Sequence, residues 1–74
     1  MADIKKLYIE LMQDYDPFDD IEEHKKYTTS QMLYNLIEIK NNNFDYIDEE
    51  SFEIYNRFKT LIEIFQSLGV KPSL

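Results

Sequence analysis

The chain has 74 residues, of which 43% are hydrophobic and 31% charged, and it contains no cysteine. These values predict one globular domain spanning residues 1–74, and they exclude a disulfide framework and thiolate metal sites. Its 15 acidic and 8 basic residues give a net charge of −7, which disfavours direct contact with nucleic acid or an anionic membrane and favours a basic protein partner.

The sequence shows neither a secretion signal nor an apolar run of the ~20 residues that a membrane span needs, so we expect a cytoplasmic protein. One glycine and two prolines give few turn signals, which favours helices over strands. The expected fold is all-α, a small bundle of three main helices plus one short helix around a single core.

The first helix is expected from about residue 3 to about residue 14. Asp3 is placed to cap its N-terminus, and Ile9 alone among its apolar residues falls on the polar face. The other apolar residues recur at the three-and-four spacing of one helical face, and they are Ile4, Leu7, Tyr8, Leu11, Met12 and Tyr15.

Asp16 followed by Pro17 predicts the start of a second helix, because aspartate is a common N-cap and proline fits the first helical position. Before Tyr27 this helix offers only Phe18 and Ile21 as apolar residues. It is therefore expected to be short and to be the weakest element.

A third helix is predicted by a capping box, in which the side chains of Thr28 and Gln31 accept hydrogen bonds from each other's backbone N–H groups. Tyr27 and Met32 stand at the hydrophobic-staple positions around this box. The helix is expected to end near residue 41, in a run of asparagines, with Tyr34 at the edge of its apolar face.

A fourth helix of about 19 residues is expected after Asp48, its predicted N-cap, with Ile47 and Phe52 as the staple pair. Gly69 and Pro72 supply the stop, and Ile64 lies at the margin of the apolar arc. That arc comprises Ile54, Tyr55, Phe58, Leu61, Ile62, Phe65 and Leu68. The first and third helices are expected to pack on this long fourth helix.

Metal and catalytic chemistry find little support in these residues. The acidic stretch from Asp14 lacks the glycine and glutamate spacing of a calcium loop, and Asp20 with His24 makes only half of a transition-metal site. With Gly69 as the sole glycine, phosphate-cradling loops are excluded. We expect a solvated His24, no metal, no cofactor and no enzymatic activity.

Two acidic runs are the main candidates for a binding surface. Residues 14–23 contain six carboxylates and residues 45–53 contain five, more than the two or three that the dipole of a helix start explains. The bland interpretation is a pair of solvated helix starts. The functional one is a single electronegative surface formed by Asp14, Asp16, Asp19, Asp20, Glu22, Glu23, Asp45, Asp48, Glu49, Glu50 and Glu53.

Apolar residues outside the core stripes, namely Ile9, Tyr34 and Ile64, are the candidates for apolar docking. The basic residues form no cluster larger than the doublets Lys5–Lys6 and Lys25–Lys26, which are too few for a nucleic-acid patch. We therefore expect a non-enzymatic protein-binding module that associates with itself or docks to a larger protein, as an inhibitor or adaptor. Two alternatives stay open: an acidic nucleic-acid mimic that blocks a basic DNA- or RNA-binding protein, and a purely structural homo-oligomer.

Overall fold

The computed structural model describes residues 3–17, 20–42 and 49–73 of the chain. Over these ranges it contains helices and no strand, which confirms the all-α prediction of three main helices plus a short one. The helices are α1 (Ile4–Tyr15), α2 (Ile21–Lys25), α3 (Thr29–Asn42) and α4 (Glu49–Ser67).

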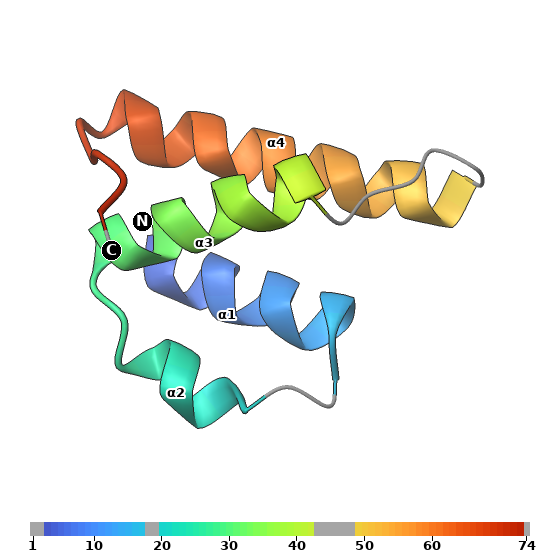
Figure 1. The fold of residues 1–74 in the computed structure, drawn as a ribbon, viewed down its shortest axis with the longest axis horizontal. Helices are drawn as coiled ribbons and strands as arrows, with labels where there is room; N and C mark the ends of the chain where they lie inside the picture. Colours follow the sequence, from blue (N-terminus) through green and yellow to red (C-terminus); the bar gives the residue numbers. More distant parts are fainter. Residues whose placement is uncertain (1–2, 18–19, 43–48, 74) are drawn as a thin grey trace.

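Helix α4 spans the molecule, and both α1 and α3 pack against it, as predicted (Figure 1). Helix α2 contacts α1 and lies on the side of α1 that is remote from α4 (Figure 1). Helices α1 and α4 run in opposite directions, so the last turn of α1 and the first turns of α4 lie toward the same end of the molecule. Two separate sides of α1 are thus covered, one by α4 and one by α2.

The core draws on the three main helices. The four-residue and three-residue spacing of apolar side chains buries one stripe on each of them, which is the pattern that the sequence predicts. Its members are Tyr8, Leu11 and Met12 on α1, Met32, Leu33 and Leu36 on α3, and Phe58, Leu61, Ile62 and Phe65 on α4. Helix α2 adds no apolar side chain to this buried set.

The predicted caps of α1 and α3 are confirmed. The Asp3 carboxylate accepts from the backbone N–H of Lys5 at 3.0 Å. The Thr28 hydroxyl accepts from the Gln31 N–H at 3.2 Å, while the Gln31 side chain accepts from the Thr28 N–H at 2.8 Å. Both helices therefore begin where local hydrogen bonding, not packing, places the start.

The second helix begins later than predicted. Pro17 lies in a turn, and the Asp16 N–H donates to the Met12 carbonyl at 2.9 Å, so Asp16 ends α1 instead of starting α2. Asp20 is the true N-cap, and its carboxylate accepts from the Glu22 N–H at 3.1 Å. The Asp-Pro pair was misleading because aspartate is favourable in both turns and caps.

The end of α4 follows the predicted glycine stop. Gly69 has φ of +84°, its N–H donates to the Gln66 carbonyl at 3.0 Å, and the Val70 N–H donates to the Phe65 carbonyl at 3.1 Å. This pair of bonds is a Schellman motif, and Val70 packs against the core. Leu68 was predicted to join the core and does not: it is 63% exposed, because the helix ends at Ser67 and the chain turns there.

At the start of α4, the predicted cap Asp48 and staple residue Ile47 lie outside the described residues. Phe52, the other staple residue, is 51% exposed and does not join the core. Helix α4 nevertheless has the predicted length of 19 residues, and α3 ends at Asn42, one residue beyond the expected end.

Candidate protein-binding surfaces

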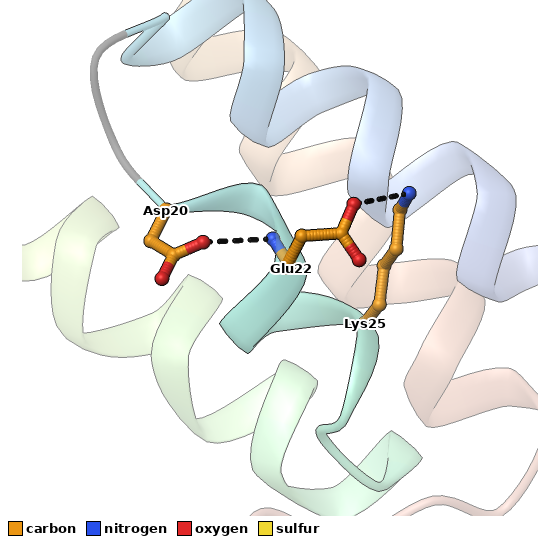
Figure 2. A network of polar contacts seen from close by, with 3 residues as sticks. All are labelled: Asp20, Glu22 and Lys25. Atoms are coloured by element: carbon orange, nitrogen blue, oxygen red, sulfur yellow. Dashed lines mark hydrogen bonds and ion pairs between the residues drawn. The ribbon is translucent and has the colours of Figure 1, made fainter.

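The first acidic run lies on the surface at the end of α1 and along α2. Asp14, Asp16, Asp20, Glu22 and Glu23 are all exposed, while Asp19 lies outside the described residues. Most of them also have a local structural role. Asp20 caps α2, and the Glu22 carboxylate accepts from the Lys25 ammonium at 3.0 Å (Figure 2). The run is thus partly explained by helix capping and pairing.

The second acidic run is exposed along the start of α4. Glu49 and Glu50 lie in the first turn, where negative charge is favourable, and Glu53 follows one turn later. Asp45 and Asp48 lie outside the described residues. Arg57, a further turn along α4, donates to the Asp14 carboxylate of α1 at 2.9 Å. The end of α1 and the start of α4 lie toward the same end of the molecule, where Arg57 pairs with Asp14, whereas α2, which carries Glu22 and Glu23, lies toward the other end (Figure 1). The described acidic residues therefore do not form one continuous surface.

His24 is buried, contrary to the expected solvated position. Only 5% of it is exposed, and its Nδ1 lies 2.8 Å from the Tyr8 hydroxyl. The Asn35 side-chain amide donates to the same hydroxyl at 2.8 Å. His24 therefore fastens α2 to α1, a role typical of a satisfied interior histidine. No three acidic or histidine side chains of the described ranges gather as a metal site.

A groove of about 290 Å³ opens between α1 and α4 on the outer surface. Leu7 and Ile64, which are 36% and 37% exposed, form its rims, and buried Leu11 and Leu61 form its floor. The polar lining residues are Glu10, Asn56, Arg57 and Thr60. The antiparallel course of the two helices brings these residues together from positions more than forty apart in the sequence.

A second hollow, of about 250 Å³, lies on the opposite side of α1 and reaches α2. Lys5, Lys6 and Lys25 surround it, and Ile9 and Met32 supply its apolar surface. Ile9, predicted to lie on the polar face of α1, is half-buried and packs against the core. Tertiary packing thus brings Lys25 to the Lys5–Lys6 doublet, from which the sequence separates it by about twenty residues.

The three apolar docking candidates line three different hollows. Ile64 lines the α1·α4 groove and Ile9 the lysine-lined hollow. Tyr34 lines a third hollow, of about 260 Å³, beside Tyr27 and Ser73. Its hydroxyl also donates to Glu38, and this bond raises the pKa of the Tyr34 phenol above its usual value. The Tyr34 hydroxyl therefore has a hydrogen-bond partner within α3.

Several residues of these surfaces were not predicted as site residues. Leu7 belongs to the apolar stripe of α1, and its spacing gave no sign that it would stand at the rim of the core. Arg57 and Lys5 were ordinary charged positions on helix surfaces. A helical wheel of α1 and α4 together would have brought Leu7 and Ile64 toward one seam, but only with the packing partner known.

No helix in the described ranges has the length and apolar character of a membrane span. No protein-family model matches the chain, and comparison with curated proteins and with solved structures gave no similar protein. The function has therefore to be inferred from the surfaces themselves.

Proposed function

We propose that the protein is a non-enzymatic protein-binding module and that a partner docks in the α1·α4 groove. The observation that carries this proposal is the apolar seam of Leu7 and Ile64, exposed over a floor of Leu11 and Leu61. Apolar side chains at the rim of a groove gain free energy when a partner removes them from water. Two neighbouring helices with apolar residues at the rim form a groove in which the apolar face of a partner helix can bind.

The size of the groove favours a protein over a small molecule. Small-molecule sites enclose about 300–1,000 Å³ and bury most of their ligand. The α1·α4 groove, at about 290 Å³, is at the lower limit of that range, and it lies open on the surface between two helices, so it would leave much of a small ligand exposed. It therefore suits a few side chains of an amphipathic helix, spaced three and four residues apart.

The charges around the groove favour a basic partner. Glu10 lines it directly, Asp14 lies one turn further along α1, and Glu53 lies one turn before Arg57 on α4. Arg57 offsets one of these carboxylates through its bond to Asp14. The remaining negative charge, in a chain of net charge −7, would attract lysines or arginines flanking an apolar stripe.

A direct test uses a labelled amphipathic peptide with leucines on one face and lysines on the other, followed by fluorescence anisotropy. Combining Leu7→Ser with Ile64→Ser should weaken its binding about tenfold, since each loses part of an apolar contact. Phe52→Ser is the matched control, because Phe52 is an exposed apolar residue of the same helix outside the groove lining. Circular dichroism would verify that all variants remain helical.

Equal loss of binding in Phe52→Ser would overturn the groove as the docking site. So would unchanged binding in the Leu7→Ser, Ile64→Ser double variant. Light scattering completes the test by measuring the oligomeric state of the wild type and of the double variant. If the wild type is a dimer and the double variant a monomer, the groove mediates self-association and not docking of a separate partner.

A further inference from the structure

The charges on α1 oppose its helix dipole. Lys5 and Lys6 lie in its first turn and Asp14 in its last, and its first turn contains no acid and its last turn no base. Positive charge near a helix N-terminus and negative charge near its C-terminus are both unfavourable. Asp14 has a partner in Arg57, which offsets that cost. At the other end of α1, the Asp3 carboxylate at the N-cap offsets part of the cost of the two lysines.

The two lysines meet a third around an apolar hollow. Lys25, near the end of α2, lies with Lys5 and Lys6 around the surface offered by Ile9 and Met32. Three of the eight basic residues of a strongly acidic chain thus gather at one place. Lys25 pairs with the exposed Glu22, whereas the ammonium groups of Lys5 and Lys6 form no ion pair with any residue in the described ranges.

The three lysines give the rim of this hollow a positive charge, which only the pairing of Lys25 with Glu22 offsets among the described residues. A surface lysine is ordinarily solvated and needs no partner, but three lysines around a hollow whose apolar lining is half-buried Ile9 and buried Met32 repel a basic ligand and attract an acidic one. A ligand that complements both the apolar lining and the ammonium groups has an apolar side chain with carboxylates on either side.

We propose that this lysine-lined hollow, formed by Lys5, Lys6, Lys25, Ile9 and Met32, binds an acidic segment of a partner protein. One large apolar side chain of that segment enters the hollow, and its flanking carboxylates pair with the ammonium groups. A volume of about 250 Å³ is below the range of small-molecule sites, which favours a single side chain of a protein as the occupant.

This surface is separate from the α1·α4 groove. Leu7 and Ile9 are two residues apart, so they point about 200° from each other around the helix. The groove lining includes Glu10 and Arg57, with Asp14 and Glu53 nearby, whereas all the charged residues that line the hollow are lysines, so each surface selects a different partner. If the groove binds as proposed above, the protein is an adaptor that holds a basic helix and an acidic segment on opposite sides of α1.

The test uses two labelled peptides: one with a phenylalanine flanked by glutamates, and one with glutamines in place of the glutamates. The acidic peptide should bind and the glutamine peptide should not, by fluorescence anisotropy at low salt. Lys5→Gln combined with Lys6→Gln should weaken binding of the acidic peptide about tenfold, the loss expected from two partly exposed ion pairs. The methyl signals of Ile9 should shift when the acidic peptide is added.

A matched control is available in Lys40→Gln combined with Lys59→Gln. These two lysines line another hollow, between α3 and α4, which also contains isoleucines but includes Glu63. The control makes the same change of net charge and should leave binding of the acidic peptide within twofold. The Lys5→Gln, Lys6→Gln variant should also melt no lower than the wild type, because it relieves an unfavourable interaction with the dipole.

Three results would overturn the proposal: equal binding of the two peptides, unchanged binding in the Lys5→Gln, Lys6→Gln variant, or an equal loss in the Lys40→Gln, Lys59→Gln control. The Leu7→Ser, Ile64→Ser variant separates this proposal from the groove. This variant should bind the acidic peptide with wild-type affinity. The two proposals can therefore be refuted independently of each other.

Discussion

The Tyr8 hydroxyl lies 2.8 Å from Nδ1 of His24 and joins α1 to α2 across sixteen positions of the chain. The Asn35 side-chain amide donates to the same Tyr8 oxygen at 2.8 Å, so one hydroxyl links α1, α2 and α3. The His24 ring also contacts the Tyr27 ring edge-on at 5.1 Å. Helix α2 has only five residues, so these contacts largely hold it in place.

Tyr8→Phe should lower the free energy of unfolding by about 1–3 kcal/mol, because it removes the hydroxyl partner of two buried or half-buried polar groups. Urea denaturation followed by circular dichroism measures the loss. Tyr27→Phe is the control, since it preserves the ring contact with His24 and should cost much less. Equal stability of Tyr8→Phe and wild type would show that the hydrogen-bonded chain from Asn35 to His24 adds nothing to the fold.

Thr28→Ala should destabilise the protein by about 1 kcal/mol, because it leaves the Gln31 N–H of the α3 N-terminus without its side-chain acceptor. Thr60→Ala serves as the comparison, as Thr60 is exposed within α4, where alanine has the higher helix propensity. Thermal melts of both variants provide the measurement. A melting temperature of Thr28→Ala at or above that of Thr60→Ala would contradict the capping role.

Gly69→Ala should cost about 1 kcal/mol, because φ at this position is +84° and a Cβ atom strains that conformation. An added Cβ would meet no atom within 4 Å, so crowding does not contribute. Gly69→Asn should cost less, since asparagine tolerates the left-handed region better. If the two variants have the same stability, the cost does not arise from the backbone conformation.

Stability should fall at alkaline pH. Burial, and then the nearby Asp16 carboxylate, raise the pKa of the Tyr15 phenol above its usual 10.0. Above about pH 10 the unfolded chain therefore loses this proton while the folded chain keeps it, and the free energy of unfolding decreases. Denaturation at a series of pH values from 8 upward should show a shallower decline in Tyr15→Phe. Identical slopes in the two proteins would refute this assignment.

The sequence alone was enough for the helices whose ends are set by local chemistry. Thr28 with Gln31 starts α3, and Gly69 ends α4 through backbone bonds to nearby carbonyls, so both were predictable from a few adjacent residues. The apolar period likewise identified the buried stripe of α4, because a single helix presents one face to a core whatever its partner. The all-α fold followed from these signals.

Other features depend on which helices become neighbours, and no local pattern encodes that. The burial of His24 required α2 to lie on α1 beside Tyr8, and the rim position of Leu7 required α4 to cover only one side of its stripe. The lysine-lined hollow likewise exists because α2 brings Lys25 to the first turn of α1. Charge and composition determined that a surface would be acidic and helical, while long-range packing decided which side chains share it.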